Sequence, residues 1–132
     1  MTVFICIDDN NGMMFNNRRQ SRDSAVVSKI VEMSNGGRLF MNGYSSKLFD
    51  GIDVLVCENF MEKAESGDFC FAENISLSDF DEKIKTLVLF KWNKIYPSDK
   101  KMDILLDGRT LEQTFDFEGS SHDIITCEVW SK

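Results

Sequence analysis

Basic residues, histidine and long apolar runs are all scarce in this chain of 132 residues. The 22 acidic side chains outnumber the 15 lysines and arginines and leave a formal net charge of −7. Because phosphate affinity comes from clustered Lys and Arg side chains, this balance argues against broad binding to nucleic acid. The apolar runs at residues 3–7 and 87–90 are too short to cross a bilayer, and no signal-peptide pattern opens the chain. We therefore expect a cytoplasmic protein that does not bind membranes.

Cysteine and histidine are too few and too widely spaced for a structural metal site. Cys6, Cys57, Cys70 and Cys127 form no Cys-x-x-Cys pair, and His122 is the only histidine. A structural zinc site needs four nitrogen or sulfur ligands in paired spacing. Three of the cysteines lie in apolar, strand-like runs, so we expect free thiols, no disulfide and no metal.

The chain does contain short apolar runs that alternate with polar turns. Residues 3–7 are apolar and β-branched and end in the sequence DDNNG, which predicts a strand followed by a turn. Apolar residues recur at helical spacing between Asp23 and Met33, with Ser21 as the expected N-cap and SNGG as the helix end. Further strands are predicted at residues 38–42, 53–57, 69–72 and 87–92, with a short helix or turn at 45–49.

The last third of the chain has a different pattern. Residues 109–117 and 124–130 alternate apolar and polar side chains on either side of an EGSS loop, which predicts an antiparallel hairpin. Strand–helix units followed by a hairpin favour an α/β fold with a mixed, mostly parallel sheet and flanking helices. No repeat or linker interrupts the chain, so we expect residues 1–132 to form a single domain.

Three stretches, in the right order, resemble dihydrofolate reductase. Residues 5–17 (ICIDDNNGMMFNN) resemble the first strand and mobile active-site loop of that family, where an apolar strand precedes Asp-x-Asn-x-x-Ile-Gly-x-x-Asn. Residues 37–45 (GRLFMNGYS) resemble its second strand and Met-Gly-Arg-x-Thr turn. Residues 86–99 (TLVLFKWNKIYPSD) resemble the strand and aspartate-bearing loop before its final hairpin. The resemblance implies a trimmed dihydrofolate-reductase-like domain over residues 1–132.

The resemblance also implies where a catalytic acid would stand. In that family an acidic residue at the start of the first helix after the mobile loop helps to protonate the pterin, and Asp23 occupies this place. A helix N-terminus and three nearby arginines should lower the pKa of the Asp23 carboxyl, the reverse of what a proton donor needs. Asp23 is therefore either a catalytic acid, if the protein is an enzyme, or only a residue that favours the helix start.

Several departures from the family pattern argue against ordinary reductase activity. The Leu-Pro-Trp of the mobile loop is replaced by RRQ at residues 18–20, and the supporting threonine aligns with Phe90, which cannot hydrogen-bond. Residues 75–85 contain no glycine, so the Gly-Gly turn and helix that hold the cofactor pyrophosphate have no counterpart. The turn at residues 41–44 also lacks the family's arginine. We expect no cofactor, with NADPH as the alternative.

Some chains similar to this one carry the label ribonuclease Z, which the residues do not support. That family holds two zinc ions through a His-x-His-x-Asp-His cluster and further ligands. A chain with one histidine cannot supply these ligands, so metal-dependent hydrolysis is not expected.

The best binding candidate is the basic cluster RRQSR at residues 18–22. Its guanidinium groups can pair with phosphate or carboxylate in bidentate geometry, and the adjacent helix N-terminus adds backbone N–H groups. The predicted ligand-binding residues are Asn10, Asn17, Arg18, Arg19, Arg22, Asn42 and Tyr44. The alternative is a solvated loop whose arginines pair with surplus carboxylates, each pair contributing only ~0–1 kcal/mol.

Three other features have ordinary explanations. His122 lies in GSSHD at residues 119–123, but triad members meet in space from separate segments, so adjacency in sequence predicts no Ser/His/Asp site. The apolar tip of the loop, residues 13–15, either closes over a ligand or fastens the loop to the core, and we favour the second. Trp92 and Trp130 are expected in the core or at the sheet edge.

These observations favour a non-catalytic, dihydrofolate-reductase-like protein that binds an anionic small molecule or an acidic protein surface. The first alternative is a divergent NADPH-dependent reductase of a pterin-like or other small substrate that uses Asp23 and three arginines. The second alternative is a homo-oligomeric accessory protein that pairs through its C-terminal strand, residues 124–130.

Overall fold

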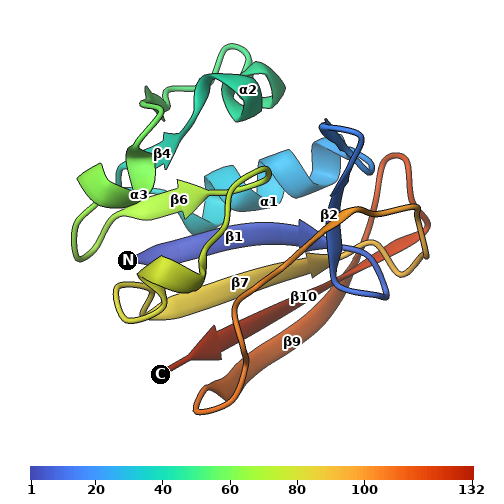
Figure 1. Ribbon diagram of the computed structural model, residues 1–132. Helices are drawn as coiled ribbons and strands as arrows, with labels where there is room; N and C mark the ends of the chain where they lie inside the picture. Colours follow the sequence, from blue (N-terminus) through green and yellow to red (C-terminus); the bar gives the residue numbers. More distant parts are fainter.

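The computed structural model describes residues 1–132 and is built around a seven-stranded sheet (Figure 1). The strand order is β5-β4-β6-β1-β7-β10-β9. The strands are β1 (Thr2–Ile7), β4 (Leu39–Met41), β5 (Leu55–Val56), β6 (Phe69–Phe71), β7 (Thr86–Lys91), β9 (Thr110–Glu118) and β10 (Ile124–Ser131). Three short strands form a second sheet in the order β3-β2-β8, namely β2 (Gly12–Phe15), β3 (Arg18–Arg19) and β8 (Lys100–Lys101).

The main sheet is mixed and mostly parallel. Strand β1 pairs in parallel with β6 and β7, and β4 pairs in parallel with β5 and β6. Strand β10 is antiparallel to both β7 and β9, so the last two strands form a hairpin at one edge of the sheet. The predictions of a mixed, mostly parallel sheet and a C-terminal hairpin are both confirmed.

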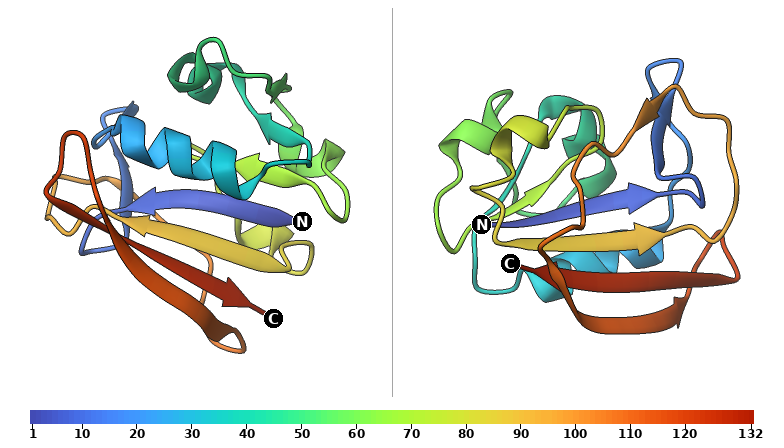
Figure 2. Two further views of the ribbon diagram at one scale, coloured as in Figure 1. Left: turned by 180° about the vertical axis from the view of Figure 1, so that it is seen from behind. Right: turned by 60° about the horizontal axis from the view of Figure 1, so that its bottom comes forward.

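Helices are few and short. They are α1 (Ser24–Met33), α2 (Gly43–Ser46) and α3 (Phe60–Lys63), with 3₁₀ turns η1 (Lys47–Phe49) and η2 (Ser78–Phe80). Helix α1 covers one face of the sheet, seen from behind in the left view of Figure 2. No helix is long and apolar enough to span a membrane.

Two apolar clusters lie on opposite faces of the sheet, and β1 contributes to both. Val3, Ile5 and Ile7 point into one cluster, and Phe4 points into the other, where Val26 of α1 packs. This alternation follows from the two-residue period of a strand. Burial of each of these apolar side chains stabilises the fold by roughly 1.5–3 kcal/mol. Because β1 contributes such side chains to both clusters, it is the central strand of the core.

The residues expected to form a mobile loop instead form the small second sheet. Met13 and Met14 of β2 are buried, which confirms that the loop tip is fastened to the core, whereas Phe15 is 40% exposed. Asn16 and Asn17 both have positive φ, as a two-residue type I′ hairpin turn between β2 and β3 requires. Asparagine tolerates positive φ, so Asn16 and Asn17 are explained by the backbone conformation of the turn.

The prediction that Ser21 is the N-cap of the first helix is wrong. Asp23, not Ser21, is the N-cap of α1, and its carboxylate accepts a hydrogen bond from Ala25 N at 2.9 Å. Ser21 lies two residues too early for this role, and its hydroxyl contacts a histidine instead. The predicted strand at residues 53–57 shortens to Leu55–Val56, and the segment at 45–49 divides between α2 and η1.

Arg109 is a buried cation that joins the start of β9 to the turn before β7. Its side chain is 1% exposed. Its guanidinium donates to the Asp81 carboxylate at 3.0 Å and to the carbonyl of Ile84 at 2.8 Å, with a longer contact to the Lys85 carbonyl. These contacts pair most of the buried guanidinium, although its Nε has no hydrogen-bond partner.

We predict that Arg109→Met lowers the free energy of unfolding by about 2–4 kcal/mol, because it removes the donor to the buried Ile84 carbonyl and the ion pair with Asp81. Urea unfolding followed by circular dichroism measures the change. Arg22→Met, which removes an exposed arginine, is the matched control and should change stability by less than about 0.5 kcal/mol. Equal effects of the two substitutions would contradict this assignment.

Candidate functional site

Buried side chains follow four of the parallel strands at their carboxyl ends, and three of them are polar. Asp8 follows β1, Asn42 follows β4 and Glu73 lies just beyond β6, and all three are buried. Trp92 follows β7 and is also buried. In α/β sheets, ligands bind outside this edge of the sheet, so it is the natural place to look for a site.

Asp8 organises the loop after β1. One carboxylate oxygen accepts hydrogen bonds from Asn10 N at 2.9 Å and Gly12 N at 2.7 Å. The other accepts from Tyr96 N at 3.0 Å and from the Gln20 amide at 3.2 Å. Burial by itself would raise the pKa of Asp8, but these hydrogen bonds outweigh it and hold the pKa below the ordinary value. Asp8 is therefore an ionised anchor for three loops.

Arg19 is paired inside the protein. Its guanidinium donates to the two carboxylate oxygens of Glu73 at 2.8 and 3.0 Å and lies 4.4 Å from the centre of the Tyr44 ring. Ser45 also donates to Glu73, at 2.8 Å, while its backbone N–H donates to the Asn42 side chain that caps α2. The structure thus brings the predicted residues Arg19, Asn42 and Tyr44 together, but around Glu73, which the sequence did not indicate.

The other predicted ligand residues lie apart from this group. Arg18 and Arg22 are exposed and form no ion pair. Asn10 and Asn17 are exposed in turns. The basic cluster at residues 18–22 is therefore divided: one arginine is neutralised by a carboxylate, and two remain free in solvent.

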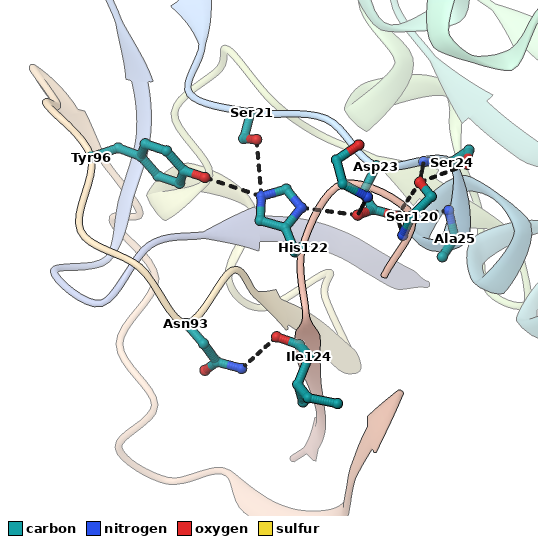
Figure 3. Close-up of polar contacts among 10 residues, drawn as sticks. Ser21, Asp23, Ser24, Ala25, Asn93, Tyr96, Ser120, His122 and Ile124 are labelled. Atoms are coloured by element: carbon teal, nitrogen blue, oxygen red, sulfur yellow. Dashed lines mark hydrogen bonds and ion pairs between the residues drawn. The ribbon is translucent and has the colours of Figure 1, made fainter. Parts of the chain in front are cut away.

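Asp23 is the most heavily bonded side chain of this edge (Figure 3). It is 4% exposed. One carboxylate oxygen accepts from Ala25 N, Ser120 N and Ser120 Oγ, each at 2.9 Å. The other accepts from Ser121 N at 2.8 Å and His122 Nδ1 at 2.9 Å. Burial raises the pKa of Asp23, but the donors from the hairpin loop outweigh it and hold the pKa far below its ordinary value.

His122 links this carboxylate to two hydroxyl groups. Because a carboxylate only accepts hydrogen bonds, Nδ1 must carry a proton. The other ring nitrogen, Nε2, lies 3.0 Å from Ser21 Oγ and 3.0 Å from Tyr96 OH, and the ring stacks on Trp92 at a centroid distance of 4.6 Å. No sequence signal could reveal these contacts, since 99 residues separate His122 from Asp23. The neighbouring Asp123, part of the GSSHD run, is exposed and takes no part.

Spaces of very different size lie near these residues. The inner cavity, lined by residues that include Cys6, Ser21, Asp23, Glu73 and Trp92, has a volume of about 10 Å³. The outer cleft has a volume of about 550 Å³ and is lined by Phe15, Asn16, Arg18, Arg19, Gln20, Tyr96 and Pro97. A hollow of about 530 Å³ lies along residues 118–124, the hairpin loop, and contains no cationic side chain of Lys or Arg. Small-molecule sites typically occupy roughly 300–1,000 Å³, so the inner cavity is too small for a ligand, and of the two larger spaces only the outer cleft is lined by arginines.

The segment after β6 contains no α-helix that could present its N-terminus to a phosphate. Residues 75–85 hold only the 3₁₀ turn η2. In addition, no group of three or more His, Cys, Asp or Glu side chains is placed to hold a metal ion.

Comparison with known proteins identifies the fold. No model of a known family matches the sequence. No curated protein matches it either. Among solved structures, the chain is similar to dihydrofolate reductase from Enterococcus faecalis in complex with NADP(H) and RAB-propyl, with a TM-score of 0.71 and 9% identity. The match covers 98% of this chain and 94% of that chain. The predicted dihydrofolate-reductase-like α/β fold is confirmed, and at this identity the likeness extends to the fold alone.

We predict that Asp23→Asn lowers the free energy of unfolding by about 2–4 kcal/mol at pH 7, because an amide cannot accept all five hydrogen bonds. The pKa of Asp23 is depressed in the folded state, so its stabilising effect is complete above the unfolded pKa, near 3.9, and is lost as the pH falls below it. The variant should therefore lose less stability between pH 5 and pH 3 than the wild type. Urea unfolding across this range measures both effects.

Asp123→Asn, in the same loop but exposed, is the matched control and should behave like the wild type. Asp8, whose pKa is also depressed, keeps some acid sensitivity in every variant. Identical pH profiles for Asp23→Asn and the wild type would contradict the role given to Asp23.

Proposed function

We propose that this protein binds an anionic small molecule in the outer cleft and does not reduce a pterin with NADPH. The observation that supports this most directly is the unpaired, exposed Arg18 on the wall of a cleft of about 550 Å³. Arg19 is on the same wall but is already neutralised by Glu73. Arg18 is therefore the cation that an incoming anion would meet.

The remaining walls of the cleft supply polar and apolar contacts. Asn16 and Gln20 offer side-chain amides, and Phe15, Tyr96 and Pro97 offer apolar surface. A ligand with an acidic group and a flat or apolar portion would match this lining better than a simple inorganic ion. Because the whole chain carries a net charge of −7, attraction of an anion depends on this local cation and should weaken as salt is added.

The surroundings of Asp23 support the second half of the proposal. A catalytic acid must reach its substrate and hold a proton near neutral pH. The Asp23 carboxylate instead accepts five hydrogen bonds from the protein, has a depressed pKa and adjoins a cavity of about 10 Å³. A pterin ring cannot enter such a space without rearrangement of the hairpin loop.

The two alternatives make different demands on the structure. A reductase would need the hairpin loop to leave Asp23 and would need NADPH to bind without a glycine turn. A homo-oligomer through residues 124–130 would need a free strand edge, but β10 lies between β7 and β9 and is paired on both sides. Pairing through the outer strand β9 would be required instead. The four free cysteines agree with the cytoplasmic location that we include in the proposal.

Calorimetric titration with NADPH and with ATP at low salt tests the proposal. We expect at least one of these anions to bind and Arg18→Glu to weaken binding by roughly tenfold or more, because reversal of the charge replaces attraction with repulsion. Lys63→Glu makes a similar charge change at an exposed position of helix α3 and should leave the affinity unchanged at matched ionic strength. No heat with either anion, or equal affinity for Arg18→Glu and wild type, would contradict the proposal.

The same samples test the reductase alternative. Oxidation of NADPH with dihydrofolate present is followed by absorbance, and we expect none above the rate without protein. Turnover that Asp23→Asn abolishes, in a variant shown to be folded, would favour the reductase alternative.

A further inference from the structure

We propose that Ser21 is a nucleophile for acyl transfer, with His122 as its general base and Asp23 as the residue that positions the histidine. This inference goes beyond the anion-binding function and does not depend on it. The three residues are Ser21 in the segment before α1, Asp23 at the N-cap of α1 and His122 in the loop between β9 and β10 (Figure 3).

The distances form a continuous chain from hydroxyl to carboxylate. Ser21 Oγ lies 3.0 Å from His122 Nε2, and His122 Nδ1 lies 2.9 Å from Asp23 Oδ2. Asp23 has extended backbone angles, and its side chain and that of Ser21 both reach the ring of His122. The imidazole can therefore bridge Ser21 and Asp23 although the two are near neighbours in sequence.

The histidine is held in the tautomer that a general base requires. The Asp23 carboxylate is buried and accepts backbone hydrogen bonds from Ser120 and Ser121, so it stays ionised and keeps the proton on Nδ1. Nε2 is then left with a lone pair directed toward hydroxyl groups. Stacking on Trp92 further restricts the ring. A buried, hydrogen-bonded aspartate that orients the imidazole is the arrangement found in serine hydrolases.

The surroundings of Ser21 leave a route for substrate and a donor for the developing negative charge. Ser21 is partly exposed, and its neighbours Gln20 and Tyr96 line the outer cleft. Ser21 itself lines the inner cavity, which at about 10 Å³ is too small for an acyl group, so a substrate must approach from the exposed side of Ser21 toward the outer cleft. The backbone N–H of Arg22, next to the nucleophile, donates no hydrogen bond to backbone oxygen within the protein, so it remains free to bind an oxyanion.

The hydrogen bonds that anchor the hairpin loop are separate from those that reach Ser21. The loop is anchored to Asp23 by the backbone N–H groups of Ser120 and Ser121. The second nitrogen of His122, Nε2, instead faces the hydroxyl groups of Ser21 and Tyr96, each 3.0 Å away.

The reaction follows from these roles. Ser21 Oγ attacks the carbonyl carbon of an ester while its proton passes to His122 Nε2. The bond to the leaving alcohol then breaks, and Nε2 returns the proton to the leaving oxygen. Water attacks the resulting acyl-serine by the same route, which releases a carboxylic acid and restores the hydroxyl. No metal, oxidant or reductant takes part.

Labelling of the intact protein with a fluorophosphonate, followed by peptide mass spectrometry, tests the proposal. We expect a covalent adduct on Ser21 that forms roughly 100-fold faster than any adduct on Ser28, an exposed serine of α1. Release of p-nitrophenol from p-nitrophenyl acetate should fall by a similar factor in Ser21→Ala and in His122→Gln. Ser28→Ala should leave both rates unchanged.

Two results would overturn the proposal: labelling of Ser21 no faster than that of Ser28 in the wild type, or an unchanged rate at Ser21 in folded His122→Gln. The first comparison is made within one molecule, so it decides the matter even if the histidine variant does not fold. The calorimetric titrations above use different probes and a different residue, and their outcome is independent of this one.

Discussion

The buried carboxylate of Asp23 is the interaction on which the arrangement of this edge of the sheet depends. An ionised group inside a protein costs several kcal/mol unless it is fully hydrogen-bonded. Asp23 meets this demand by drawing on two parts of the chain: the first turn of α1 and the loop of the β9–β10 hairpin, which includes His122. The helix start, the hairpin loop and the histidine are therefore placed by one charge.

The space next to Asp23 is small, whereas the open space beside the arginines lies elsewhere. The dihydrofolate-reductase-like sheet is present, but the cavity beside Asp23 measures about 10 Å³, and Arg19 is paired with Glu73. A larger cleft lies between the β2–β3 hairpin and the loop of Tyr96 and Pro97, where Arg18 is exposed. Because function resides in sites rather than in folds, the likeness to dihydrofolate reductase carries no activity by itself.

Local patterns predicted the elements because they depend on near neighbours. Two-residue alternation identified the hairpin, and the continuous apolar runs identified the central strands β1 and β7. The cap of α1 was assigned to Ser21 because both Ser21 and Asp23 have side chains suited to capping. The tertiary structure decides between them: the Ser21 hydroxyl contacts His122, whereas the Asp23 carboxylate caps the helix while it also binds the hairpin loop.

The sequence by itself determined the main strands, the first helix, the hairpin at the end and the likeness of the whole chain to one known fold, but not the small sheet of β2, β3 and β8. Only the tertiary structure decided that Arg19 is paired while Arg18 is free, and that Ser21, Asp23 and His122 meet. The physical reason is the separation in sequence between the residues that make each kind of contact. Strand and helix patterns arise from contacts between residues close in sequence, whereas Glu73 lies 54 residues from Arg19 and His122 lies 101 residues from Ser21. Such pairs are set by how the sheet brings strand ends together, which no local pattern records.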